Sequence, residues 1–257
     1  MALMDEFKKE REELRNGTFK DKLNYFWYYY KWYVIGILCA LIVIVTLVYQ
    51  IATEKEDAFK AVMLNANLLT EDGSYAEDFA EYADIDLNEN IVFFDASLYI
   101  TDDIMDADAY ASIQKLTAYT MSEDVDIMVT DAHSFRKYAH NELFYDLRTI
   151  LSEEQLEKYE PYFYYVDQKT IEELNAYYEN SDGSDETTEI TYPDPTKPEE
   201  METPIPVGIY LDNSEKLQEN FYFTQVEENG EHVVVGIYIF TEHPETALQF
   251  LDFVFEE

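Results

Sequence analysis

The sequence predicts an α/β protein that carries one N-terminal transmembrane helix. Residues 33–51, YVIGILCALIVIVTLVYQI, form a single apolar run without any charged side chain. After this run, strand-like segments rich in β-branched and aromatic residues alternate with segments whose apolar residues recur at helical spacing. The composition includes 23 Tyr and 16 Phe, which supply the apolar area that the core of one domain needs.

The length of the apolar run matches a membrane. At about 1.5 Å per residue the run spans about 28 Å, close to the roughly 30 Å hydrocarbon core of a bilayer. A helix is the only single segment that satisfies its own backbone there. We therefore expect a cytoplasmic basic and aromatic tail at residues 1–32, a transmembrane helix at 33–52 and one extracytoplasmic α/β domain at 53–257.

The charges that flank the run predict its orientation in the cell membrane. Seven of the 17 Lys and Arg residues precede it, and the residues that follow it, ATEKED at 52–57, are mostly acidic. Positive flanks stay in the cytoplasm, so the N-terminus is expected inside. No A-x-A pattern follows the run, which favours a single-pass, uncleaved signal anchor over a cleaved signal peptide.

Aromatic residues crowd the segment just before the run. Rings that are apolar at one edge and polar at the other collect at the lipid headgroups, so this segment predicts an anchor that contacts membrane lipid. Its candidate anchor residues are Trp27, Tyr30, Lys31, Trp32 and Tyr33.

The charge of the chain limits its partners. The formal net charge is −38, and nearly all of it lies after residue 32. Such a field repels nucleic acid and favours cationic partners or divalent cations, although a solubilising surface is the more common reason for such a charge. The single cysteine, Cys39, lies in the apolar run, so the expected domain must fold without a disulfide.

The expected domain alternates between strands and helices. This order predicts an α/β layer with a largely parallel sheet. We expect one exposed acidic, Pro-rich loop at 179–206, which holds five of the seven prolines. The expected strands are 58–65, 91–100, 125–130, 207–211 and 233–240, and the expected helices are 75–83, 106–121, 133–139, 152–159 and 244–255.

Two of the expected helices have a defined apolar face, and a third has a capping signal. Ser152 and Gln155 have the spacing of a capping box. Apolar spacing predicts the buried faces of the other two. They are Ala109, Ile113, Leu116 and Thr120 in the helix at 106–121, and Ala247, Leu248, Leu251, Val254 and Phe255 in the last helix.

Three stretches together resemble extracellular solute-binding proteins of bacterial ABC importers. They are 125–151 (VDIMVTDAHSFRKYAHNELFYDLRTIL), 205–211 (IPVGIYL) and 233–255 (VVVGIYIFTEHPETALQFLDFVF). The layout is also similar to single-span proteins of Gram-positive anaerobes with an aromatic-rich anchor. The resemblance implies a reduced, membrane-anchored relative of one lobe of a periplasmic-binding-protein-like fold.

The candidate ligand-binding residues are Asp131, His133, Tyr164 and Tyr165. Asp131 ends an expected strand, where open α/β sheets place their ligands. The tyrosines could stack on a sugar, although core packing explains them equally well. A metal held by Asp126, Asp131, His133 and His140 is a further hypothesis, but the two histidines are seven residues apart, too far for an i, i+4 pair.

An acidic group follows the second expected strand. Its members are Asp102, Asp103, Asp106 and Asp108. Carboxylates suit calcium, but acids at the start of a helix also stabilise its dipole. No cofactor is otherwise expected, so calcium is the one ion that these residues suggest.

The motifs of common enzyme classes are missing from the sequence. It has no G-x-S-x-G, H-E-x-x-H, P-loop or G-x-G-x-x-G pattern. We therefore expect a non-enzymatic binding domain for a solute or a protein partner at the cell surface. The alternatives are an accessory component of a membrane or envelope complex whose partner is a membrane protein, and an enzyme that acts on cell-wall polymer.

Overall fold

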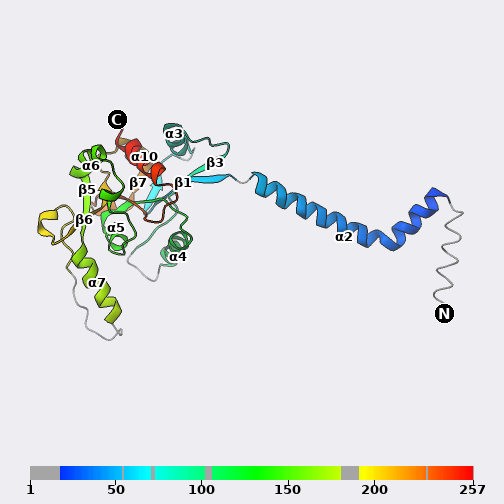
Figure 1. The fold of residues 1–257 in the computed structure, drawn as a ribbon, viewed down its shortest axis with the longest axis horizontal. Helices are drawn as coiled ribbons and strands as arrows, with labels where there is room; N and C mark the ends of the chain where they lie inside the picture. The colour runs from blue at the N-terminus through cyan, green and yellow to red at the C-terminus, as the bar shows by residue number, and fades with distance from the viewer. Residues whose placement is uncertain are drawn as a thin grey trace. The chain divides into compact units, whose positions relative to one another are not determined.

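The computed structural model describes residues 18–53, 55–70, 73–101, 106–180, 191–229 and 231–256 of the 257-residue chain (Figure 1). The chain divides after residue 54 into two units, which are described separately. The first unit contains α2 (Phe19–Thr53), and the second contains the sheet and the remaining helices. This division lies close to the boundary that the sequence predicts.

Helix α2 is the one described helix that is long and apolar enough to cross a membrane. It begins 14 residues earlier than expected, so the aromatic segment and the apolar run form one continuous helix. No Gly or Pro interrupts the chain between Thr18 and Val34, which explains this continuity. Its 35 residues measure about 52 Å, more than a bilayer core needs.

The five predicted anchor residues all lie on α2. Trp27, Tyr30, Trp32 and Tyr33 are exposed on the helix. The ammonium of Lys31 lies 5.8 Å from the centre of the Trp32 ring, within the range of a cation–π contact.

The second unit is built on a mixed six-stranded sheet in the order β3-β1-β4-β8-β6-β5. Strand β1 pairs in parallel with both β3 and β4, while β8 is antiparallel to β4 and β6, and β5 is antiparallel to β6. Strands β3, β1, β4 and β6 therefore share one direction. The strands are β1 (Glu56–Met63), β3 (Asn90–Asp95), β4 (Ile127–Asp131), β5 (Phe163–Asp167), β6 (Pro204–Tyr210) and β8 (Val233–Ile237).

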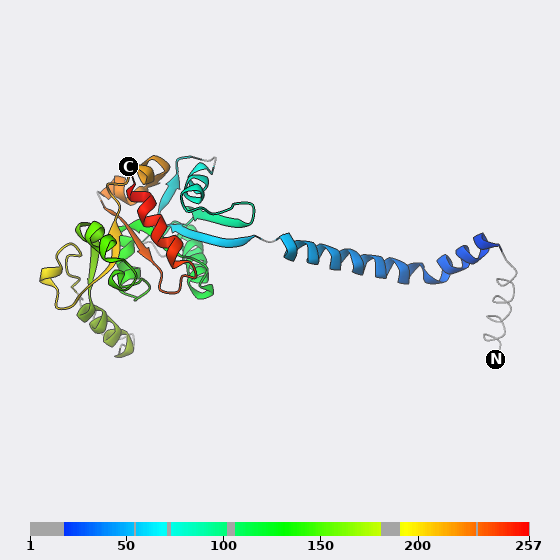
Figure 2. The same cartoon turned by 45° about the horizontal axis from the view of Figure 1, so that its top comes forward.

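Helices cover both faces of this sheet. Alternate residues of each strand enter one of two apolar clusters, as the pleat requires. One cluster packs against α3 (Ser74–Tyr82), α6 (Glu153–Tyr159), α8 (Glu215–Asn220) and α10 (Pro244–Phe255), with α10 lying over the sheet in Figure 2. The other packs against α4 (Ala107–Ser122), α5 (Ala132–Ala139) and α7 (Gln168–Asn180).

Smaller elements complete the second unit. Strands β2 (Ala66–Leu68) and β7 (Phe221–Phe223) form a separate antiparallel pair. The other short elements are α9 (Thr224–Asn229) and the 3-10 turns η1 (Leu147–Thr149), η2 (Glu160–Tyr162) and η3 (Pro198–Glu200).

The expected strand 91–100 is too long. Pairing of β3 with β1 stops at Asp95, because the Asp95 carboxylate accepts hydrogen bonds from the backbone N–H and the hydroxyl of Ser97 and turns the chain. The expected buried face of α4 is also partly wrong. Ala109, Ser112 and Leu116 are buried, whereas Ile113 is 41% exposed.

The predicted loop 179–206 is partly ordered. Helix α7 continues to Asn180, β6 begins at Pro204, and 181–190 lie outside the described residues. Hydrogen bonds hold the second half, together with the buried side chain of Met201. The Asp167 carboxylate accepts the backbone N–H groups of Glu202 and Thr203, and the Tyr165 N–H donates to the carbonyl of Pro195.

The two VGIY segments of the sequence share one structural role. They place Gly208 on β6 and Gly236 on β8, and the ring of Phe135 from α5 lies against both glycines. A Cβ atom at Gly208 would lie 2.8 Å from this ring, and one at Gly236 would lie 2.7 Å from it. Phe144 stacks on Phe135 with ring centres 4.7 Å apart. The glycines therefore set the distance between α5 and the sheet.

We expect Gly208→Ala to destabilise the second unit by about 1–3 kcal/mol, because a buried ring must move. Urea unfolding of the full-length protein in detergent micelles measures this loss. Gly36→Ala is the matched control, since nothing lies within 4 Å of a Cβ at Gly36. Equal unfolding midpoints for the two variants would show that the packing of Phe135 against the sheet does not require a glycine at position 208.

Candidate functional site

The sheet has a topological switch point at β1. From β1 the chain passes through α3 to β3 on one side, and then through α4 to β4 on the other side of β1. In open α/β sheets, ligands bind beyond the carboxyl ends of the strands at such a point. Here the carboxyl ends of β1 and β4 lead to Asn65 and Asp131.

A buried polar network closes the switch point itself. The Asn65 amide donates to the Asp131 carboxylate at 3.0 Å and to the Ser134 hydroxyl at 3.1 Å, and its oxygen accepts the Ile100 N–H at 2.8 Å. Asp131 is fully buried and caps α5 by accepting the Ser134 N–H. The structure thus gives Asp131 the role of an internal cap that holds α5 on β1 and β4.

A cleft lies beside this network. It consists of two hollows of about 300 and 500 Å³ that share His133 and Glu231. The smaller hollow also contacts Ser134 and Lys137, and α5 contributes to both. The larger hollow has aromatic and proline walls supplied by Tyr164, Tyr192, Pro193, Pro195 and Tyr210. We call the two hollows together the carboxyl-edge cleft.

Tyr164 reaches the cleft from β5. Its side chain is 2% exposed and lines the larger hollow, whereas the buried hydroxyls without a hydrogen-bond partner among the described residues are those of Tyr75 and Tyr238. Burial raises the pKa of Tyr164 well above the usual range, so the hydroxyl is neutral and can donate at neutral pH.

Tyr165 faces the opposite way. Successive strand residues alternate, so Tyr165 packs with the cluster beneath α6 and α10, away from the cleft. The structure therefore brings His133 and Tyr164 together, leaves Asp131 beneath the cleft as a cap, and separates Tyr165 from all three.

One wall of the cleft is fixed by stacking. The Arg136 guanidinium lies 5.1 Å from the centre of the Tyr192 ring, and the His140 ring meets the same tyrosine at 4.7 Å. His140 is 7% exposed and its Nδ1 contacts the Arg136 carbonyl at 2.8 Å. Burial lowers the pKa of His140, so it is neutral at pH 7. Tyr192 is thereby held against α5.

The proposed metal ligands do not meet. Asp126 lies before β4, at the opposite edge of the sheet from Asp131 and His133, so the four-residue metal hypothesis is wrong. Asp106 caps α4 by accepting the N–H groups of Asp108 and Ala109, which fits the helix-start interpretation. Asp102 and Asp103 lie outside the described residues, and no cluster of three metal-ligating side chains occurs among those described.

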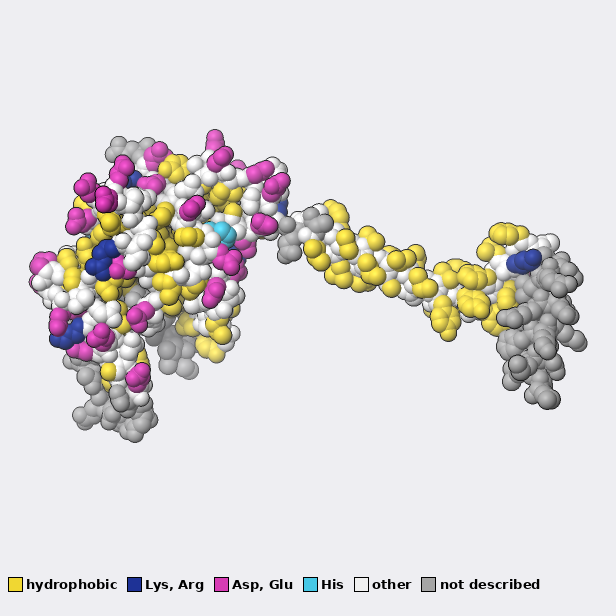
Figure 3. All heavy atoms as spheres, in the orientation of Figure 1, with side chains coloured by type: hydrophobic (Ala, Val, Ile, Leu, Met, Phe, Trp, Pro, Cys, Tyr) yellow, Lys and Arg dark blue, Asp and Glu magenta, His cyan; other side chains and the backbone are white. Residues whose placement is uncertain are grey.

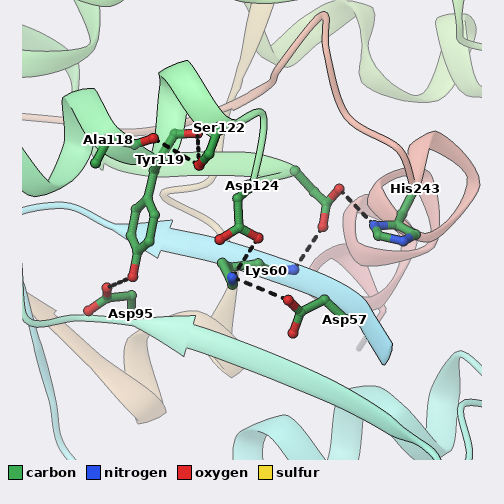
Figure 4. Close-up of polar contacts among 9 residues, drawn as sticks. Asp57, Lys60, Asp95, Ala118, Tyr119, Ser122, Asp124 and His243 are labelled. Atoms are coloured by element: carbon green, nitrogen blue, oxygen red, sulfur yellow. Dashed lines mark hydrogen bonds and ion pairs between the residues drawn. The ribbon is translucent and has the colours of Figure 1, made fainter. Parts of the chain in front are cut away.

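A separate hollow, of about 370 Å³, lies at the amino edge of the sheet, away from the carboxyl-edge cleft. Figure 4 shows its network, in which the Lys60 ammonium contacts Asp124 at 2.7 Å and Asp57 at 3.5 Å. Asp126 accepts the Lys60 N–H at 2.7 Å, contacts His243 Nδ1 at 3.1 Å and accepts the Thr241 hydroxyl. These groups satisfy one another, so the network joins β1, β4 and the start of α10 and needs no ligand.

Asp95 anchors α4 to the edge of β3. Its carboxylate is 2% exposed and pairs with the Lys115 ammonium at 2.5 Å. It also accepts the Tyr119 hydroxyl at 2.8 Å, as Figure 4 shows. Burial opposes ionisation, but the bonds from Lys115, Ser97 and Tyr119 outweigh it and hold the pKa of Asp95 below its usual range.

Comparison with known proteins gave no relative. No protein-family model, curated protein or solved structure matches the chain. The fold and the cleft therefore have to be interpreted from their own geometry.

Sequence reasoning missed most residues of the cleft. Arg136, Tyr192, Tyr210 and Glu231 come from α5, two connecting segments and β6, and only the pairing of the strands brings them together. Arg136 could have been identified as a candidate cleft residue from the sequence, because it belongs to the short helix that follows Asp131. Asn65 could have been noticed as the polar residue that ends the first apolar segment.

We expect Asp95→Asn to lower the free energy of unfolding by about 1–2 kcal/mol at pH 7, because the Lys115 pair is lost. The folded-state pKa is depressed, so this contribution exists above the ordinary carboxyl pKa of about 4 and disappears as pH falls through the lower folded value. Urea unfolding from pH 7 to pH 2.5 should show the difference between the two proteins shrinking below about pH 4. Asp78→Asn, on the exposed face of α3, is the control; a pH-independent difference for Asp95→Asn would contradict the ionic explanation.

Proposed function

We propose that this chain is a single-pass, membrane-anchored and non-enzymatic binding protein. Its domain lies outside the cytoplasm and takes a solute in the carboxyl-edge cleft, in the manner of one lobe of a solute-binding protein. The observation that carries the proposal is the larger hollow of this cleft, which combines aromatic walls from Tyr164, Tyr192 and Tyr210 with the charged side chains of Arg136 and Glu231.

The position and walls of the cleft support a binding role. It lies beyond the carboxyl ends of β1 and β4, and its larger hollow falls within the usual size range of small-molecule sites. Aromatic and proline walls combined with a few polar groups are typical of such sites. The amino-edge hollow lacks this character, since its network is internally satisfied.

The distribution of charge supports the orientation. Basic side chains concentrate before the apolar part of α2, and Figure 3 shows Asp and Glu side chains over much of the visible surface of the second unit. An acidic, cysteine-free domain after such a helix fits export across the cell membrane.

Solute binding predicts a rise in thermal stability. We expect the full-length protein in nanodiscs to melt at a higher temperature with one class among sugars, amino acids and short peptides, since a ligand at about 100 times its Kd adds about 2.7 kcal/mol. Tyr164→Phe keeps the core but removes the hydroxyl, so it should weaken the shift. Tyr222→Phe, an exposed tyrosine on β7, is the matched control and should not. No shift with any solute would contradict this function.

The orientation predicts which residues are accessible on intact cells. In a Cys39→Ala background, a membrane-impermeant maleimide should label Glu199→Cys in η3 and leave Lys20→Cys in α2 unlabelled until the cells are lysed. Labelling of Lys20→Cys alone on intact cells would reverse the proposed orientation.

A protein partner is the second candidate function. Strand β3 is an edge of the main sheet, and its Ile91 and Phe93 side chains are 39% and 42% exposed. Half-exposed apolar side chains on an open edge are a common contact surface for another chain. Crosslinking in cells tests this function. If the double variant Ile91→Ser with Phe93→Ser loses a crosslinked partner and Tyr164→Phe keeps it, a partner role is favoured over solute binding.

A further inference from the structure

Within the part of the chain that the structure describes, two charged side chains of the carboxyl-edge cleft have no partner of opposite charge. Arg136 and Glu231 both line the larger hollow, yet no ion pair joins them to each other or to any other described residue. The chain has 55 acidic residues against 17 Lys and Arg, so an unpaired arginine is unusual here. Most other basic residues of the second unit do have carboxylate partners: Lys60, Lys115, Arg148, Lys158, Lys169, Lys197 and Lys216.

Both unpaired groups are partly withdrawn from water. Arg136 and Glu231 are half-buried, and Arg136 is held against Tyr192 on one side. Removing a charge from water without an opposite charge is unfavourable, so such groups are found where a ligand supplies the missing partner. The arrangement therefore offers one positive and one negative position within a single cleft.

The hydroxyl of Tyr164 adds a neutral donor near the positive position. Tyr164 and Arg136 both line the larger hollow, and burial raises the pKa of Tyr164, so its hydroxyl is neutral there. A guanidinium and a hydroxyl that line one hollow suit the two oxygens of a carboxylate.

Extending the proposed function, on which this inference rests, we infer that the carboxyl-edge cleft binds a small dipolar molecule. Its carboxylate contacts Arg136 and Tyr164, its ammonium contacts Glu231, and its body packs between Tyr210 and the prolines at 193 and 195. The ligand class is that of amino acids and short peptides.

Other ligand classes fit these charges less well. A dianion such as phosphate would face Glu231, Asp194 and the net negative charge of the chain. A neutral sugar would leave Arg136 and Glu231 unpaired. A dipolar molecule neutralises both positions and adds no net charge.

The test is a titration of the full-length protein in nanodiscs with each standard L-amino acid and with dialanine, followed by calorimetry. For any ligand that binds, the analogue without its ammonium and the analogue without its carboxylate are titrated next. We expect each analogue to bind at least about 10-fold more weakly, because a hydrogen-bonded charge is lost. Arg136→Gln should weaken binding of the parent ligand by a similar factor but leave the affinity for the carboxylate-free analogue unchanged. Glu231→Gln should also weaken binding of the parent ligand, but leave the affinity for the ammonium-free analogue unchanged.

Matched controls are Arg148→Gln and Glu157→Gln, which remove the same charges outside the cleft and should leave every affinity unchanged. Near-ultraviolet circular dichroism of each variant establishes that it is folded. Binding of a sugar in a manner that depends on Tyr164 but not on Arg136 or Glu231 would overturn the dipolar inference and keep the proposed function. Absence of binding by every amino acid and dialanine would overturn the inference, and absence of binding by sugars as well would overturn both.

Discussion

The contact between Phe135 and the glycines of β6 and β8 is the constraint on which the cleft depends. Because neither Gly208 nor Gly236 has a Cβ, α5 approaches the sheet closely enough for Phe135 to fill the space above both strands. His133, Ser134 and Arg136 surround Phe135 in the sequence, so their positions follow from that one ring. Phe144 and Tyr164 pack on Phe135 in turn, which ties the aromatic wall of the cleft to the same contact.

The two edges of the sheet differ in how their polar groups are satisfied. At the amino edge, Lys60 and Asp126 are bonded to neighbours that join β1, β4 and α10. At the carboxyl edge, Asn65 and Asp131 satisfy each other below the cleft, while Arg136 and Glu231 above them form no ion pair within the described part of the chain. Charged groups withdrawn from water usually find partners, so two unpaired charges in one cleft support the proposed binding role of the carboxyl edge.

Aromatic packing explains how the second unit forms a core without a disulfide. Phe59, Phe79, Phe94 and Phe250 form a mutually contacting group between β1, β3, α3 and α10. Large rings contribute much buried area per residue, and their edge-to-face contacts add to it. The opposite face of the sheet, where α5 lies, can therefore carry half-buried charges without the whole unit losing its stability.

The sequence by itself determined the features that depend on local periodicity and local hydrogen bonds. The apolar run, the helix 244–255, the strand before Asp131 and the capping box of Ser152 and Gln155 were all predicted, because neighbours along the chain specify them. The resemblance to a solute-binding lobe and the solute-binding function stay predictions. Only the tertiary structure decided the reversed directions of β8 and β5, the exposure of Ile113 and the separation of Asp126 from His133. It also decided that Arg136, Tyr164 and Glu231 line one cleft, because strand pairing between distant segments places them there and no local pattern records that pairing.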